Sequence, residues 1–426
     1  MIYDLPLEKS ARPPDWIVQS LNQLADVAGG GTPETGVAEY WHPAEILWVT
    51  PTDITSCSGN VLTRTERGIS QSGLRESSAN LLPVGTTLLT SRATVGECRL
   101  AGVPVATNQG FASLVAREGS DSRFLFYLAQ SLKPVLVRLA AGTTFIEVSR
   151  REIRRVNVCV PREAKEREAI GRILSIADEA IAAAEKQLAS ARRLKTALMQ
   201  QLFTRGLPGR HTRFQKTKWF EAPSCWRFRQ LRQVAAVQSG FTMGRDLSGY
   251  ETVEVTYLTV INVQEGAFDV SNVQSVQVKA SEVEDLMLRP GDVLMTEGGD
   301  RDKLGRGGLW NGQIQPCVYQ NHIFRIRFQS NTYKPELFHF LLQTWQAKNY
   351  FYAHAKQTSN LCTINSRELK RFPFREPPPD EQEEMVSLLQ GADSELSAIE
   401  SELMSLNRLK RSLLHNLLTG RVRVKV

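Results

Sequence analysis

Two segments of this chain carry the same long helical pattern, and this repeat limits the fold more than any other feature. Residues 170–204 and 385–419 align without a gap at an offset of 215 residues (385 − 170), which pairs Ile170 with Met385. The same offset pairs Arg193-Leu194-Lys195 with Arg408-Leu409-Lys410. Gap-free agreement over such a length indicates an internal duplication.

Apolar residues in each segment recur at alternating steps of four and three, the heptad pattern of a helix that pairs with another helix. A lysine interrupts the pattern in both copies, Lys195 and Lys410. A helix of about 35 residues is about 50 Å long, too long to be hidden inside a small domain. Because the chain must return, we expect an antiparallel coiled coil, although each helix could instead pack on its own domain. The predicted interface residues are Ile170, Leu174, Ile181, Leu188, Leu198, Leu389, Leu396, Leu403 and Leu413.

The duplication extends, more faintly, to the parts of the chain before each helix. LPVGTTLLTS (82–91) matches LRPGDVLMTE (288–297), and SRREIRRVNVCVP (149–161) matches NSRELKRFPFREP (365–377). Short β-prone runs between turn residues, with one helical segment per copy at about 123–139 and 335–353, indicate a mixed α+β fold. We therefore expect two pseudo-repeated α+β domains separated by two long helices. The predicted boundaries are 1–160 for the first domain, 161–210 for the first helix and linker, 211–376 for the second domain and 377–426 for the second helix.

The amino-acid composition excludes few classes of function. The 52 Lys and Arg residues exceed the 45 Asp and Glu residues, for a formal net charge of +7, which favours a polyanionic partner without identifying one. The six cysteines are scattered without zinc-ligand spacing, so mostly buried, reduced thiols are expected. The N-terminus lacks a signal-peptide pattern and no stretch approaches eighteen consecutive apolar residues, so we expect a cytoplasmic protein without a membrane partner.

No set of residues typical of a catalytic or metal site is found in the sequence. There is no GxxxxGK[ST] phosphate loop and no catalytic tetrapeptide of the amino-methyltransferase type. Four carboxylates between residues 292 and 302 resemble a nuclease cluster, but the first copy has Thr86 and Ser91 where the second has Asp292 and Glu297. Asp292 is more simply a turn residue. We expect neither catalytic residues nor metal ligands in this chain.

Polar loops differ most between the two copies. TSRATVGECR (90–99) corresponds to TEGGDRDKLGRG (296–307), and AAGTTFIEVS (140–149) to AHAKQTSNLCTINS (353–366). Such side chains bind phosphates or read base edges, although for any single residue a solvated loop is the simpler interpretation. Together the loops predict two readers of different DNA sequences. The candidate DNA-binding residues are Arg92, Thr94, Arg99, Thr143, Thr144, Arg301, Lys303, Arg306, Lys356, Gln357 and Asn360.

At this point the whole chain resembles the DNA specificity subunit of type I restriction-modification systems. The resemblance rests on PGDVLMT with its counterpart VGTTLLTS, on NQG and QNH, and on PPPDEQEEMVSLL opening a helix that ends LKRSLLHNLLTGRV. The first copy departs from the family pattern at PREAKER, where Glu166-Arg167 replaces the usual acidic residue followed by Gln.

The resemblance implies a non-catalytic subunit with two target recognition domains, which read the two halves of a bipartite site on double-stranded DNA at a spacing fixed by the helices. The implied partners are two methyltransferase (modification) subunits, which flip and methylate adenine, and motor-nuclease (restriction) subunits. S-adenosylmethionine, ATP and Mg are then expected on those partners, and no cofactor in this chain. Two other classes stay open: a stand-alone DNA-modifying enzyme and a coiled-coil adaptor unrelated to DNA.

Overall fold

The protein forms two compact units, each containing one globular domain and half of each long helix. The computed structural model describes residues 13–140, 146–216, 221–300, 304–330, 332–358 and 361–425. The first unit comprises Met1–Gln187 and Ile399–Val426, and the second comprises Leu188–Ala398. The chain thus divides within its helices, whereas the predicted domain boundaries lie at their ends.

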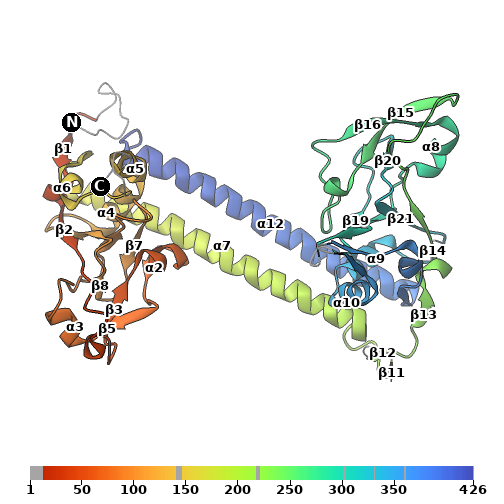
Figure 1. Ribbon diagram of the computed structural model, residues 1–426, viewed down its shortest axis with the longest axis horizontal. Helices are drawn as coiled ribbons and strands as arrows, with labels where there is room; N and C mark the ends of the chain where they lie inside the picture. Colours follow the sequence, from red (N-terminus) through yellow and green to blue (C-terminus); the bar gives the residue numbers. More distant parts are fainter. Residues whose placement is uncertain are drawn as a thin grey trace. The chain divides into compact units, whose positions relative to one another are not determined.

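The first unit is built on three antiparallel or mixed sheets (Figure 1). Their strand orders are β2-β9-β6-β7-β4, β5-β3-β8 and β1-β10. The strands are β1 (Trp16–Ser20), β2 (Ala25–Gly29), β3 (Ile46–Val49), β4 (Val61–Leu62), β5 (Arg67–Ile69), β6 (Thr87–Leu89), β7 (Cys98–Ala101), β8 (Val105–Thr107), β9 (Ala112–Ala116) and β10 (Asn157–Pro161). The short helices are α1 (Leu21–Leu24), η2 (Ala38–Tyr40), α2 (Pro51–Ser56), α3 (Gln71–Arg75), α4 (Ser122–Ser131), α5 (Lys133–Ala140) and α6 (Arg150–Arg155).

The second unit repeats this plan with strand orders β14-β21-β17-β19, β16-β15-β20 and β13-β24. Two small sheets, β18-β23-β22 and β11-β12, are additional. The strands are β11 (Phe214–Lys216), β12 (Glu221–Pro223), β13 (Arg227–Gln230), β14 (Ala235–Ser239), β15 (Thr252–Leu258), β16 (Gln274–Lys279), β17 (Val293–Thr296), β18 (Gly298–Gly299), β19 (Gly307–Leu309), β20 (Cys317–Tyr319), β21 (Ile323–Phe328), β22 (Lys356–Thr358), β23 (Leu361–Thr363) and β24 (Pro373–Glu376). The short helices are η3 (Leu231–Gln233), η4 (Val260–Asn262), α8 (Ala280–Leu286), α9 (Pro335–Leu342), α10 (Trp345–His354) and α11 (Ser366–Lys370).

The duplication inferred from the sequence is therefore a duplication of topology. In each unit, two strands of the three-stranded sheet pair in parallel. They are β3 and β8 in the first unit and β15 and β20 in the second. The matched segments LPVGTTLLTS and LRPGDVLMTE supply β6 and β17, each an inner strand of the main sheet. Four of the six cysteines are buried, and all six are thiols rather than disulfides, as expected.

The single helical segment expected in each copy is wrong, because each copy has two helices. In the first unit the break falls between α4 and α5, where Pro134 lacks the N–H that would continue the helical hydrogen bonds. In the second unit Thr344 caps a new helix, since its side chain accepts a hydrogen bond from the N–H of Ala347 at 3.3 Å. A proline in the first unit and a capping threonine in the second, rather than hydrophobic periodicity, decide these breaks.

The long helices are α7 (Ala164–Arg205, 42 residues) and α12 (Pro379–Leu418, 40 residues). They begin 215 residues apart, at the offset of the sequence repeat, and are longer than the expected 35 residues. A glycine with a positive φ of 71° follows each, Gly206 and Gly420, in the backbone conformation that commonly ends a helix. Among the described residues, no helix is both long and apolar enough to cross a membrane.

Candidate nucleic-acid interface

The two polar loops of the second unit form one small sheet. β18 pairs with β23, and β23 pairs with β22, so strands from both loops are hydrogen-bonded together. The N–H of Ile364 also donates to the carbonyl oxygen of Glu297 at 2.8 Å. Lys356 and Gln357 lie exposed on the edge strand β22, and their side chains alternate between its two faces. Arg301, Lys303 and Asn360 lie outside the described residues.

The first unit joins its corresponding loops in the same way. The N–H of Val148 donates to the carbonyl oxygen of Ser91 at 2.9 Å, the counterpart of the Ile364 bond. Arg92 Nε lies 3.6 Å from a carboxylate oxygen of Glu147, and the backbones of these two residues form an isolated bridge. Ala93 has a φ of 60°, a left-handed conformation that is strained for alanine and that turns the loop sharply. Thr143 and Thr144 lie outside the described residues.

Two other candidates form hydrogen bonds within their own domain, and a third has a buried hydroxyl. Arg99 donates to the carbonyl oxygens of Cys98 and Cys57 at 2.7 and 3.3 Å. Arg306 donates to the carbonyl oxygen of Val260 at 3.2 Å and is half-buried. The Thr94 hydroxyl is buried and has no hydrogen-bond partner within the described part of the chain. Their role in DNA binding stays a prediction. The exposed Lys356 and Gln357 need less rearrangement to reach a ligand, whereas Arg92 is half-buried beside Glu147.

Two of the carboxylates considered as a nuclease cluster, Asp292 and Glu297, have structural partners, whereas Asp302 lies outside the described residues. Asp292 is buried, and its carboxylate accepts hydrogen bonds from the N–H of Arg289 at 2.8 Å and from Arg327 Nε at 2.6 Å. The first of these bonds closes the turn that the sequence predicted. Glu297 accepts from His322 Nδ1 at 2.9 Å. Within the described ranges, no group of three or more His, Cys, Asp or Glu side chains is placed to bind a metal ion.

Both long helices contribute to the core of each unit. In the first unit Ile170 and Leu174 of α7 pack in the same cluster as Leu417 of α12. In the second unit Leu202 of α7 packs in the same cluster as Leu389 of α12. The start of one helix thus lies with the end of the other in each unit, which is the predicted antiparallel arrangement. The nine predicted interface residues are all buried or half-buried: Ile170, Leu174, Ile181, Leu188, Leu198, Leu389, Leu396, Leu403 and Leu413.

The lysines that interrupt the heptads meet aspartates on the opposite helix. In the first unit Lys410 Nζ lies 2.5 Å from Asp178 Oδ1. The other carboxylate oxygen of Asp178 accepts from the Tyr127 hydroxyl at 2.6 Å and from Asn60 Nδ2 at 2.5 Å. Burial, reinforced by the bond to Asp178, raises the pKa of Tyr127 well above its usual value. The polar cluster therefore joins both long helices to α4 and to the loop before β4.

The second unit contains the equivalent ion pair in a different setting. Lys195 pairs with Asp393, and Lys195 Nζ also lies 5.6 Å from the ring centroid of Phe340. His339 lies on the adjacent helix α9, and its Nε2 is 3.0 Å from Gln343 Nε2. Burial lowers the pKa of His339 to about 4. This side chain is consequently neutral near pH 7.

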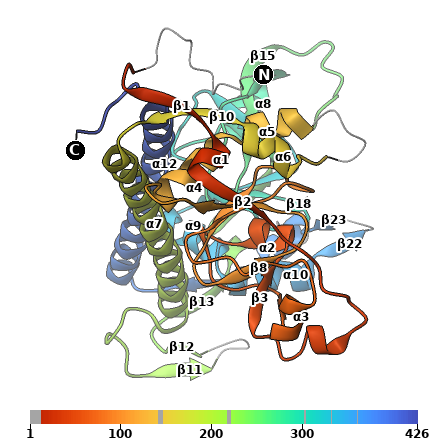
Figure 2. The same ribbon diagram turned by 90° about the vertical axis from the view of Figure 1, so that its left-hand side faces the viewer.

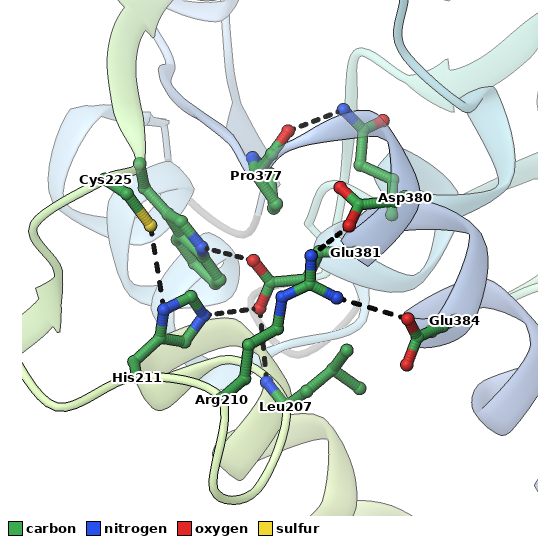
Figure 3. A network of polar contacts seen from close by, with 10 residues as sticks. Leu207, Arg210, His211, Cys225, Pro377, Asp380, Glu381 and Glu384 are labelled. Carbon is green, nitrogen blue, oxygen red and sulfur yellow. Dashed lines mark hydrogen bonds and ion pairs between the residues drawn. The ribbon is translucent and has the colours of Figure 1, made fainter.

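A buried glutamate at the start of α12 binds the chain that leaves α7 (Figure 3). Glu381 accepts hydrogen bonds from His211 Nε2 at 2.7 Å, from Trp226 Nε1 at 3.0 Å and from the N–H of Leu207 at 3.2 Å. Its position in the first helical turn also favours a negative charge, because the N-terminus of a helix is electropositive. Arg210 pairs nearby with Asp380 and, at 3.1 Å, with Glu384.

The first unit reproduces this junction with other residues. Glu166, at the position equivalent to Glu381, accepts two hydrogen bonds from Arg423 at 2.7 and 2.9 Å. Arg423 also donates to Asp15, and this bond lowers the pKa of the Asp15 carboxyl. In both units, then, the chain that follows one long helix is bound by the buried glutamate that begins the other.

The departure from the family pattern at Arg167 leaves the start of the helix unchanged. Arg167 donates to the carbonyl oxygens of Pro161 at 2.6 Å and Gly119 at 2.7 Å. Its counterpart Gln382 donates to those of Pro377 at 2.8 Å and Thr332 at 3.1 Å. Arginine and glutamine thus bridge the same two places in the fold. Because both supply N–H donors at the end of a flexible chain, the substitution keeps the junction.

The roles of Asp178, Asp393 and the glutamates of the first helical turns were not predicted from the sequence. A signal was present in the sequence, because the 215-residue offset that pairs Lys195 with Lys410 also pairs Asp178 with Asp393. Repeated charges of opposite sign beside a helical seam are candidates for cross-helix pairs. The partners of Glu166 and Glu381 differ between the copies, so the repeat alone could not have identified them.

Comparison with known proteins shows which proteins this chain is similar to. A family model described as "Type I restriction modification DNA specificity domain" matches residues 13–191. The MjaIX specificity subunit of a type I restriction enzyme from Methanocaldococcus jannaschii is 25% identical over 417 residues, which cover 97% of this chain and 95% of that protein. The EcoprrI specificity subunit from Escherichia coli is 30% identical over 122 residues, 28% of this chain and 29% of that protein.

Solved structures show the same fold along the chain. The S subunit of a type I restriction-modification system from M. genitalium aligns with a TM-score of 0.56 at 14% identity, covering 98% of this chain and 99% of that one. A chain from a structural study of type I assembly and conformational transition gives a TM-score of 0.57 at 17% identity, covering 98% and 100%. The resemblance inferred from the sequence is confirmed, because the family model and the curated relatives are both those of type I restriction-modification specificity subunits. Its relatives are named as specificity subunits, in agreement with the prediction of a non-catalytic chain.

Proposed function

We propose that this chain recognises the two halves of a bipartite DNA target, one half with each unit. The observation that supports this most directly is that one framework is used twice with different loops. The bonds from Val148 to Ser91 and from Ile364 to Glu297 hold the loops in equivalent places. The loop sequences themselves differ, with an Arg92–Glu147 pair in one unit and the β18-β23-β22 sheet in the other. Equivalent placement with unlike side chains suits two readers of unlike sequences.

The repeated junctions support a second part of this proposal, in which the chain is a scaffold for two modification subunits and for restriction subunits. Two similar partners need two similar docking sites, and each unit repeats the same combination of globular domain, helix start and returning chain. S-adenosylmethionine, ATP and Mg belong to those partners in this proposal. The cytoplasmic location expected from the sequence fits a protein that acts on cellular DNA.

The test is to map modified adenines in genomic DNA by single-molecule sequencing. Cells expressing this chain with its neighbouring methyltransferase subunit are compared with cells lacking this chain. A split motif of two short half-sites around a fixed spacer, present only with this chain, is the expected result. A motif that is unchanged in the absence of the chain would contradict recognition by this subunit. S-adenosylmethionine binding by the isolated chain would favour a stand-alone enzyme instead.

A further inference from the structure

One short helix in each unit carries a repeated row of basic residues, separate from the junctions and from the candidate DNA-binding loops. In the first unit it is α6, with the sequence RREIRR, and in the second it is α11 with the flanking Arg371, SRELKR. Arg151 corresponds to Arg367 and Arg155 to Arg371. Ile153 and its counterpart Leu369 are buried and hold each helix on its domain. We call Arg151 and Arg155 with Arg367 and Arg371 the basic ridges.

The ridge residues are exposed and mostly without anionic partners. Arg151 and Arg155 have no ion pair or side-chain hydrogen bond to any other described residue, whereas the neighbouring Arg154 donates to the carbonyl oxygen of Val27 at 3.0 Å. In the second unit Arg371 lies 3.5 Å from Glu368, and Arg367 is exposed. Residues four apart on a helix face the same side, so each ridge places two positive charges close together. Such pairs repel each other unless an anion binds them.

Each ridge borders the polar loops of its own unit. Ser149 caps α6 by accepting the N–H of Glu152 at 3.2 Å, and Asn365 caps α11 by accepting the N–H of Glu368 at 3.0 Å. The residue before each cap, Val148 or Ile364, makes the bond described above to the other loop. Helix α6 lies beside α1 and β2 (Figure 2). The start of each short helix is thereby fixed beside the polar loops of its unit.

We propose that the basic ridges bind the phosphodiester backbone of the DNA next to each half-site and so position the reading loops. This inference rests on the proposed function and extends it from base reading to backbone anchoring. Guanidinium groups suit phosphate oxygens, with which they form two parallel hydrogen bonds. Backbone contacts fix the register of a protein on the duplex but carry no sequence information. The polar loops can differ between copies, whereas a ridge that binds phosphate keeps its charge, as these two do.

The experiment measures salt-dependent DNA binding by the assembled complex of this chain with its modification subunits. Fluorescence anisotropy compares two duplexes. One carries the motif found by mapping modified adenines, and in the other both half-sites are scrambled. The variants are Arg151→Gln/Arg155→Gln and Arg367→Gln/Arg371→Gln. The matched control is Arg172→Gln/Arg408→Gln, which removes two exposed charges from the long helices. Thermal melting of each variant tests whether it is folded.

Each ridge variant should bind both duplexes more weakly by the same factor and leave their affinity ratio unchanged. The slope of log K against log salt should become less steep by about 2, because each phosphate contact contributes about 0.9. An unchanged salt slope overturns the proposal. It does so even if the affinity falls because the variant has lost a modification subunit. A loss confined to the motif duplex overturns it in favour of base reading. If the wild-type complex does not distinguish the two duplexes, the proposed function itself fails.

Discussion

Lys410 Nζ lies 2.5 Å from Asp178 Oδ1, and the equivalent residues Lys195 and Asp393 form the same pair in the second unit. Each lysine that interrupts a heptad is therefore the partner of an aspartate on the other helix. A parallel alignment of the two copies in register would instead place lysine opposite lysine and aspartate opposite aspartate. Because like charges in a partly buried seam are unfavourable, these four residues favour the antiparallel pairing.

Removing the Asp178 carboxylate should destabilise the protein more than removing its lysine partner. Asp178→Ala leaves Lys410, Tyr127 and Asn60 without their acceptor, and we expect the free energy of unfolding to fall by about 2 kcal/mol. Lys410→Met leaves Asp178 with two neutral donors and fills the seam, so a loss of less than about 1 kcal/mol is expected. Urea unfolding measures both. The exposed Arg408→Met is the control, and equal effects of Asp178→Ala and Arg408→Met would contradict the role of the cluster.

The pH dependence of the unfolding free energy should reveal the titration of the His339 side chain. Burial lowers its pKa to about 4 in the folded protein, against about 6.5 in an unfolded chain, while Asp393 opposes this shift and Lys195 adds to it. The unfolded state therefore binds more protons between these values, and the stabilisation is lost as pH falls from about 6.5 to 4. The full effect corresponds to about 3 kcal/mol.

A comparison of His339→Gln with the wild type isolates this contribution from that of the carboxylates. The variant should lose stability less steeply than the wild type between pH 6.5 and 4, measured by urea titration at several pH values. His415→Gln is the matched control, because His415 is exposed on α12. Parallel curves for the wild type and His339→Gln would show that His339 does not titrate as the structure implies.

The junction at Glu381 should depend on its charge as well as its shape. Glu381→Gln keeps the size of the side chain but offers an N–H to one of three donors, and we expect a loss of about 2 kcal/mol in unfolding free energy. Glu384→Gln alters an exposed carboxylate one turn away and should change stability by less than about 1 kcal/mol. If both variants unfold at the same urea concentration as the wild type, the buried network contributes no net stability.

The repeat explains how much of the architecture could be predicted from the sequence. A gap-free offset places Lys195 and Lys410 at equivalent points of two helices, and the heptads around them require a helical partner. Antiparallel pairing and duplicated topology follow from those two facts. The breaks at Pro134 and Thr344 were not predicted, because a continuous apolar pattern runs through both and only a proline in one and a capping bond in the other interrupt the helix.

The candidate site could be located but not resolved residue by residue. Pattern differences between the copies identify the loops, and the structure joins those loops in each unit through Val148 and Ile364. The sequence does not say that Arg99 is bonded to two backbone carbonyl oxygens while Lys356 is exposed. That distinction depends on which carbonyl oxygens the fold leaves within reach of an arginine, and such long-range contacts leave no local sequence pattern.

Arg167 offers a direct test of the equivalence between the two junctions. Arg167→Gln introduces the residue found at the equivalent position 382, and a glutamine can still donate to one or two of the same carbonyl oxygens. We expect a loss of about 1 kcal/mol, against about 2–3 kcal/mol for Arg167→Ala, which leaves the carbonyl oxygens of Pro161 and Gly119 unpaired. Thermal unfolding ranks the two variants. Equal destabilisation would mean that the glutamine does not take over the arginine's bonds.

Lys356 and Gln357, adjacent on the edge strand β22, should affect DNA binding in different ways. A glutamine amide can form two hydrogen bonds with adenine, so Gln357→Ala should relax the preference at one position of a half-site by about 1–3 kcal/mol. Lys356→Ala should weaken binding to all sequences and make the salt slope less steep by about 1. Competition binding to duplexes with single substitutions in either half-site separates these outcomes.

The other half-site in the same duplex is an internal control, because the first unit is proposed to read it. Neither variant should alter the preference there. Gln390→Ala on the exposed face of α12 controls for loss of an amide elsewhere. If Gln357→Ala changes affinity equally at every substituted duplex, Gln357 contacts the backbone, and base reading by the second unit then depends on other residues of its loops.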